Sequence, residues 1–139
     1  MPVSATAATL RSLLERGETA RLECKAASGG LPRSFWETYS AFANTDGGTV
    51  VLGVSEPQPG RWSIQGVTDP TKLEKALWDT VNNRQKISAN ILFSRHVRAE
   101  RLDGKDVLVV EVPRAERTDR PVYVGPDVFR GTFRRNGEG

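Results

Sequence analysis

The stretch that most constrains the fold is "GGLPRSFWETYSAFANTDGGTVVLGV", which runs from Gly29 to Val54 of the 139-residue sequence. Its aromatic residues recur at helical spacing, and Pro32 suits the first turn of a helix. The polar and glycine residues at 44–48 end this helix, because glycine permits positive φ and a tight reversal. The uniformly apolar run at 49–54 predicts a strand in the centre of a sheet. An aromatic helix followed by a central strand is therefore expected.

Turn signals and apolar periodicity divide the rest of the chain into short elements. We expect a helix over 4–17, strands over 21–25, 49–54 and 62–67, a helix over 71–83, and strands over 91–102, 105–113, 121–124 and 128–135. Asp69-Pro70 caps the 71–83 helix, and Asp103-Gly104 is a strong hairpin signal. The sequence thus predicts a single α+β domain over 1–139, with a mixed or mainly antiparallel sheet and about three helices.

Composition narrows the class of protein. The single cysteine, Cys24, excludes an internal disulfide and is typical of a reducing cytoplasm. With one histidine, His96, it also argues against a structural zinc site. The longest apolar run is far shorter than the roughly 20 residues of a membrane span. We therefore expect a cytoplasmic protein without a membrane segment.

Positive charge is concentrated in the second half of the chain. Residues 1–70 carry 6 Lys and Arg against 7 Asp and Glu, whereas residues 71–139 carry 14 against 10. The candidates for phosphate contact are Lys25, Arg114, Arg117, Arg120, Arg130, Arg134 and Arg135. A basic surface of this kind attracts nucleic-acid backbones, although a solvated face is an equally good explanation.

Two carboxylates near the start of the chain lie five residues apart. Glu18 precedes the predicted strand at 21–25 and Glu23 projects from it, so a structural change separates them and the two could converge. The alternative is that Glu23 pairs with Lys25 or Arg21. The spacing alone permits an acidic site without requiring one.

Several ordered motifs resemble one known family. "ECK", "FANTDGG" followed by "LGV", "IQGV", "PVYV" and "RRNGEG" together resemble the Schlafen AlbA_2 domain over about residues 15–139. The resemblance implies a DNA-binding or nucleic-acid-binding module, common at the N-terminus of bacterial transcriptional regulators. Those chains often continue into ATPase-like and winged-helix modules. Because "FRRNGEG" has no closing element after it, we expect further C-terminal domains in the same chain.

The same resemblance implies a second hypothesis. Some vertebrate Schlafen proteins cleave RNA with a divalent metal ion held by three acidic residues. Glu18 and Glu23 match the first two positions in spacing and context, and in "GVSEP" only Glu56 could match the third. Three such carboxylates suit Mg²⁺ or Mn²⁺, and the implied activity is a metal-dependent ribonuclease. Otherwise no cofactor is expected, and no nucleotide site.

The leading interpretation is thus a nucleic-acid-binding module that uses a basic surface. The alternatives are the ribonuclease with Glu18, Glu23 and Glu56, and a protein-interaction module. Among the three tryptophans, Trp36 and Trp78 are expected in the core, and Trp62 is the best exposed candidate for base stacking. Asn44 is explained by helix termination. The sequence leaves open DNA against RNA, and monomer against homo-oligomer.

Overall fold

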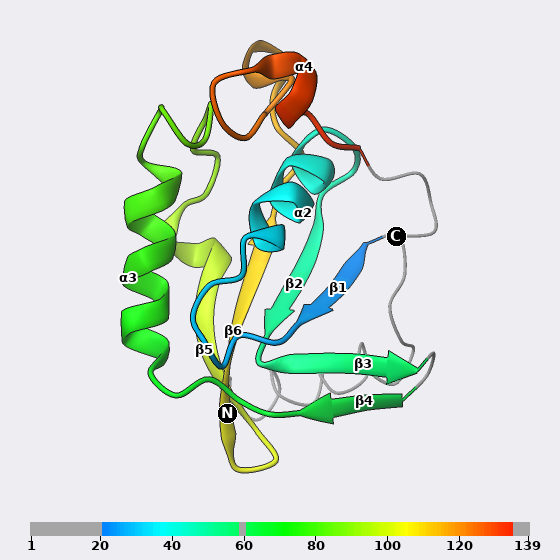
Figure 1. Ribbon diagram of the computed structural model, residues 1–139, viewed down its shortest axis with the longest axis vertical. Coiled ribbons are helices and arrows are strands. Elements are labelled where there is room, and N and C mark those ends of the chain that lie inside the picture. Colours follow the sequence, from blue (N-terminus) through cyan, green and yellow to red (C-terminus); the bar gives the residue numbers. More distant parts are fainter. Residues whose placement is uncertain (1–20, 59–60, 135–139) are drawn as a thin grey trace.

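Four strands form one mixed sheet in the order β1–β2–β6–β5 (Figure 1). The structure is a computed structural model, which describes residues 21–58 and 61–134. Strand β1 (Leu22–Lys25) runs parallel to β2 (Gly48–Leu52), and β6 (Lys105–Val112) is antiparallel to both β2 and β5 (Val97–Leu102). The predicted fold class, a single α+β domain with a mixed sheet, is confirmed.

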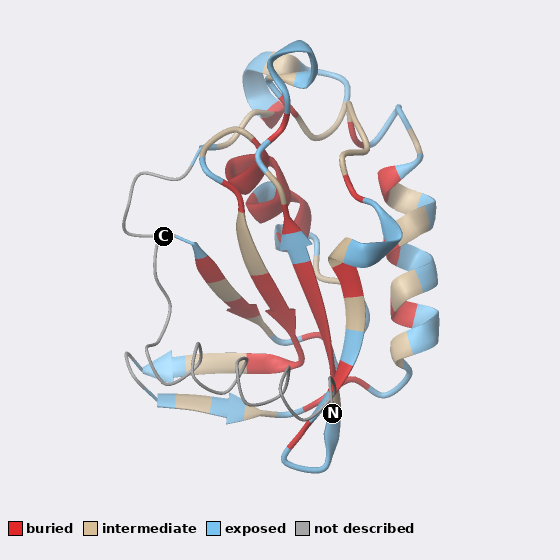
Figure 2. Cartoon of the chain, turned by 180° about the vertical axis from the view of Figure 1, so that it is seen from behind, coloured by how far each residue is buried: buried red, intermediate tan, exposed pale blue. Residues whose placement is uncertain are grey.

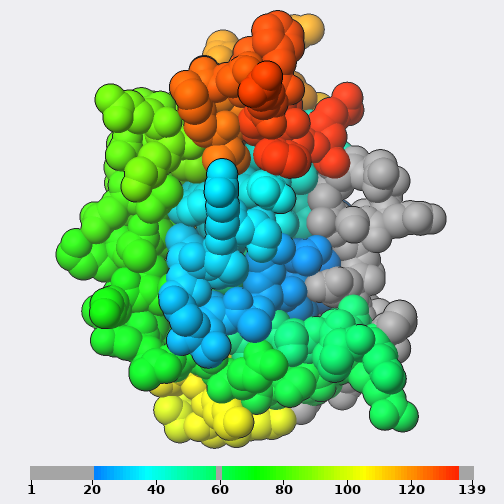
Figure 3. Space-filling model, viewed as in Figure 1, coloured from blue at the N-terminus to red at the C-terminus, as the bar shows by residue number. Residues whose placement is uncertain are grey.

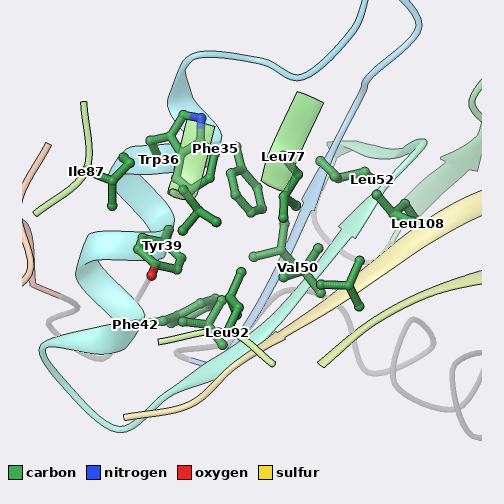
Figure 4. Packing of buried hydrophobic residues seen from close by; sticks show 14 of the residues in the cluster. Phe35, Trp36, Tyr39, Phe42, Val50, Leu52, Leu77, Ile87, Leu92 and Leu108 are labelled. Atoms are coloured by element: carbon green, nitrogen blue, oxygen red, sulfur yellow. The ribbon is translucent and has the colours of Figure 1, made fainter. Parts of the chain in front are cut away.

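Two helices cover one face of the sheet (Figure 1). They are α2 (Ser34–Ala43) and α3 (Pro70–Val81), and the Asp69 side chain caps α3 by accepting a hydrogen bond from the Lys72 backbone N–H at 3.1 Å. The core between helices and sheet is lined by buried aromatic and aliphatic side chains (Figure 4), including Phe35, Trp36, Tyr39, Phe42, Val50, Leu52, Leu77 and Leu108. The helix predicted over 4–17 lies outside the described residues.

The central strand β2 is buried on both faces, as its apolar sequence predicted. Val50 and Leu52 join the helix-side core, whereas Val51 joins a second cluster on the opposite face. Figure 2 shows the red of buried residues continuing along β2 and β6 on that side. Trp62 packs against the second cluster and is half-buried, as is Trp78 against the first, so the structure does not single out Trp62 as the exposed tryptophan.

The strand predicted over 49–54 is interrupted at Gly53. This residue has φ of +107°, which turns the chain out of the main sheet. Val54 then begins β3 (Val54–Gln58), which pairs with β4 (Arg61–Ile64) in a separate two-stranded sheet. The strand predicted over 62–67 is therefore present as β4, which pairs with β3 and not with the central sheet.

The turn between α2 and β2 leaves no room for side chains. A Cβ atom on Gly47 would lie 2.8 Å from the Val112 carbonyl oxygen, and one on Gly48 would lie 2.6 Å from the Phe42 ring. Gly47 also has φ of +76°. This tight reversal places the end of α2 directly against the end of β6.

Three of the later predicted strands are wrong in part. The strand expected over 91–102 begins only at Val97, because residues 94–96 form a 3₁₀ turn, η1 (Ser94–His96). The closing strands at 121–124 and 128–135 are reduced to two isolated bridges, and the one-turn helix α4 (Val128–Gly131) lies between the bridged segments. Asp127 starts α4, since its carboxylate accepts a hydrogen bond from the Phe129 N–H at 2.9 Å.

Tyr39 ties α2 to the segment that precedes β5. Its hydroxyl donates to the Ala89 carbonyl oxygen at 2.8 Å and accepts from the Ile91 N–H at 3.1 Å. Burial raises the pKa of Tyr39 to about 12, because the ionised phenolate would lie in an apolar environment.

Within the described residues, no helix has the length and apolar character that crossing a membrane requires.

Candidate nucleic-acid interface

Asn44, at the C-terminal end of α2, connects two segments from the far end of the chain. Its Nδ2 donates to the carbonyl oxygens of Val122 at 2.9 Å and Phe133 at 3.0 Å. Its Oδ1 accepts from the Val122 N–H at 2.8 Å. The sequence accounted for Asn44 by helix termination alone, and these partners 78 and 89 residues away gave no local signal.

Ser40, one turn earlier, makes a second link to the same segments. Its fully buried hydroxyl donates to the Val122 carbonyl oxygen at 2.7 Å and accepts from the Phe133 N–H at 3.0 Å. In Figure 3 the late segments, in orange and red, lie directly against the cyan surface of α2. Ser40 and Asn44 therefore fix the chain on both sides of α4 relative to the core.

The loop after β6 is held against α2 as well. The Ala115 N–H donates to the Ala43 carbonyl oxygen at 2.8 Å, and the Ala115 side chain is buried. The loop then forms a short 3₁₀ turn, η2 (Arg117–Asp119), before it reaches Val122. The backbone of the loop that carries these arginines is therefore attached to α2 at both of its ends, at Ala115 and at Val122.

These anchored segments line a shallow, open pocket of about 460 Å³, which we call the arginine pocket. Its lining residues are Asn44, Arg117, Arg120, Pro121, Thr132 and Arg134. None of these is acidic, and no described acidic residue forms an ion pair with the three arginines. Among the described residues, Arg120 Nε is the one buried side-chain nitrogen or oxygen atom without a hydrogen-bond partner. The pocket therefore concentrates positive charge and an unused donor.

The arginines of the central sheet differ from those of the pocket. Arg98 bonds to Glu111, and its Nε lies 2.8 Å from the buried carboxylate of Glu100. Burial lowers the pKa of Arg98, but the hydrogen bonds to Glu111 and Glu100 outweigh it and raise the pKa. Arg101 similarly contacts Asp106 at 3.1 Å. Their charges are balanced within the protein.

The other predicted phosphate contacts do not line the pocket. Arg114 is exposed on the loop, and Arg130 is exposed on α4, where its Nε lies 3.6 Å from the Asp127 carboxylate. Lys25 on β1 lies 3.6 Å from the Glu23 carboxylate, and both side chains are largely shielded from solvent, so this lysine already has a partner within the protein. Arg135 lies outside the described residues. Of the predicted set, the structure brings together Arg117, Arg120 and Arg134.

Two of the three predicted metal ligands lie on strands that the structure describes. Glu23 is half-buried on β1 and Glu56 is half-buried on β3, two strands that contact each other. Glu18 lies outside the described residues. Within those residues, no group of three His, Cys, Asp or Glu side chains is placed to hold a metal ion. The metal site stays a prediction.

His96 has a structural partner. Its Nδ1 accepts a hydrogen bond from the Phe93 N–H at 2.9 Å, and the two rings lie 5.8 Å apart. The Arg95 guanidinium lies 4.8 Å from the centre of the Phe93 ring. Partial burial, and then the charge of Arg95, lower the pKa of His96 below its usual value. This cluster stabilises the entry to β5.

Comparisons with known proteins agree with this architecture. The solution NMR structure of the N-terminal domain of a protein from Nitrosomonas europaea related to the ATP-dependent DNA helicase RecG is similar, with a TM-score of 0.69 and 30% identity over 99% of this chain and 90% of that chain. The crystal structure of the DIP2311 protein from Corynebacterium diphtheriae shares the fold, with a TM-score of 0.53 and 20% identity. The similarity covers 87% of this chain but 24% of that one.

A search of curated proteins found no match. The family described as Schlafen, AlbA_2 matches residues 18–139, which is most of the sequence. This match includes the α2–β2 turn, the arginine pocket and the segments that Asn44 connects. The chain belongs to the Schlafen AlbA_2 family.

Proposed function

We propose that this domain binds nucleic acid through the arginine pocket, as the DNA-binding module of a bacterial transcriptional regulator. The observation that carries the proposal is the arrangement of Arg117, Arg120 and Arg134 around one open pocket without an acidic lining residue. A guanidinium group presents several N–H donors in a plane that matches the oxygens of a phosphate. Arg120 Nε is a buried donor that no described residue satisfies, which is consistent with a charged group whose partner comes from outside the domain.

The anchoring of the pocket supports the same function. Arg120 and Arg134 are close in sequence to Val122 and Phe133, whose backbone groups bond to Asn44 and Ser40. Arginines that start from a fixed backbone lose less conformational freedom on binding. Contacts of this type give affinity for the phosphate backbone without reading sequence.

One similar structure and the family match support this proposal. The similar N-terminal domain belongs to a protein related to a DNA helicase, and the Schlafen AlbA_2 family matches nearly the whole chain. The similar structure shares the fold of this domain, and the arginine pocket provides the guanidinium groups that would bind phosphate.

The test is a binding titration with a fluorescent duplex and a single strand at several salt concentrations. The variant Arg117→Gln/Arg120→Gln/Arg134→Gln removes three positive charges from the pocket. We expect it to weaken binding at least tenfold at low salt. For duplex DNA, the slope of log affinity against log salt should decrease by roughly 2 to 3 in magnitude.

The matched control removes the same charge elsewhere. Arg101→Gln/Arg114→Gln/Arg130→Gln changes the net charge equally but leaves the pocket intact. We expect this control to retain most of the affinity. Equal losses in the two triple variants would show that net charge alone drives binding, and the proposal would then fail.

A further inference from the structure

Phe129 on α4 is an apolar side chain that is exposed to solvent. Its exposed fraction is 93%, and Phe93 at 59% is the other large hydrophobic residue exposed in the described part of the chain. The Phe93 ring already contacts Arg95 and His96. Phe129 makes no ring contact with a described residue. Both faces of its ring are therefore open to a ligand.

The short helix α4 holds Phe129 in a defined place. The Phe129 N–H donates to the Asp127 carboxylate at 2.9 Å, and the Gly131 N–H donates to the Asp127 carbonyl oxygen at 2.8 Å. The Thr132 hydroxyl donates to the Val128 carbonyl oxygen. These bonds fix the backbone on both sides of Phe129, so the exposed ring is presented by an ordered turn.

This turn adjoins the arginine pocket. The chain enters α4 after Pro121 and leaves it at Thr132, and both of these residues line the pocket. Between them, the Val124 N–H donates to the Gly131 carbonyl oxygen at 2.8 Å. Because three residues span at most about 11 Å, Phe129 lies within that distance of Thr132, measured between Cα atoms. One nucleic-acid strand can therefore reach both features.

We propose that Phe129 stacks on an unpaired base of a single strand whose phosphate occupies the arginine pocket. This inference rests on the proposed function and adds its substrate class. In a duplex, neighbouring base pairs cover the faces of each base, whereas an unpaired base can turn out and stack on an aromatic ring. The contact requires a π-face and no particular base, so it selects single strands without selecting sequence.

The experiment compares Phe129→Ala with the wild-type protein on a single strand, tested as DNA and as RNA, and on a blunt duplex of the same sequence. Removing one stacking side chain should lower single-strand affinity about 5- to 100-fold. Duplex affinity should change less than twofold. Phe129→Trp should keep single-strand affinity, and its fluorescence should change on binding.

Two controls isolate the stacking contact. Phe93→Ala removes an exposed phenylalanine whose ring already contacts Arg95 and His96, and it should leave both affinities within twofold. An abasic single strand keeps the phosphates but has no base to stack on. On this strand Phe129→Ala and wild type should bind equally. Since Phe129 is exposed, its variant should unfold at the wild-type temperature.

Equal losses on single strand and duplex would overturn the inference, and so would an unchanged single-strand affinity. In the second case, continued sensitivity to the arginine-pocket variant would leave the proposed function standing and show that Phe129 takes no part in it. If neither nucleic acid binds the wild-type domain, the proposed function and this inference are both refuted.

Discussion

Asn44→Ala should lower the free energy of unfolding by about 2–4 kcal/mol. The substitution removes the three hydrogen bonds of 2.8–3.0 Å to Val122 and Phe133. Each such bond contributes about 0.5–1.5 kcal/mol net, and a partly buried backbone group left without its partner adds to the loss. The Val122 carbonyl oxygen keeps its bond from Ser40, which limits the upper end of the range.

Asn82→Ala is the matched control for this substitution. Asn82 is the C-terminal cap of α3, with φ and ψ of −86° and −2°, and Asn44 caps α2 with −89° and −2°. The Asn82 side chain is exposed and bonds to Trp78 and Asn90 nearby. Because both variants place alanine at the same backbone geometry, the difference between them isolates the long-range bonds. We expect Asn82→Ala to cost about 1 kcal/mol or less.

Urea denaturation followed by fluorescence measures both variants. Asn44→Ala should also weaken nucleic-acid binding, because the backbone beside Arg120 and Arg134 loses its attachment to α2. Asn82→Ala should bind like the wild type. Equal destabilisation by the two substitutions would refute the reasoning, since the bonds to Val122 and Phe133 would then contribute nothing measurable.

Three further substitutions have expected outcomes. Gly131→Ala should destabilise by about 1–3 kcal/mol in the same urea assay, because its Cβ would lie 1.9 Å from the Val124 carbonyl oxygen. The lowered pKa of His96 means that the unfolded chain binds the proton more readily, so stability should rise with pH up to about the usual value of 6.5 and then level off. His96→Asn should remove that slope. Tyr39→Phe should cost about 1–3 kcal/mol at neutral pH by removing two hydrogen bonds. It should also remove a loss of stability above about pH 10, where the unfolded tyrosine ionises before the buried one.

Much of the fold could be predicted from the sequence because its signals are local. The aromatic face of α2, the Asp69 cap of α3 and the Asp103-Gly104 turn each depend on residues a few positions apart. The closing segment was harder. Residues 121–134 carry strand-like residues, but the Asp127 cap starts a helical turn there and leaves only isolated bridges.

The sequence predicted which residue type forms the candidate site, but it did not predict which arginines come together in the folded domain. The sequence identified the late arginines, yet Arg114 and Arg130 have the same local character as Arg117 and Arg134. Which of them meet depends on how residues 113–134 fold back onto α2. That path is set by Asn44 and Ser40, whose partners lie 78 to 93 residues further on. Neither the periodicity nor the spacing of residues in a sequence predicts such a long-range hydrogen bond.

The large sequence separation between Ser40 or Asn44 and their hydrogen-bond partners has a consequence for folding. Contacts of such high sequence separation form late, because a large loop must close before they stabilise anything. On the ribosome, the end of α2 would wait for its partners until Phe133 had emerged. A truncation before that residue would therefore leave polar groups of Ser40 and Asn44 unpaired inside the protein. The arginine pocket, which Asn44 and Arg134 both line, is thus complete only when the fold itself is complete.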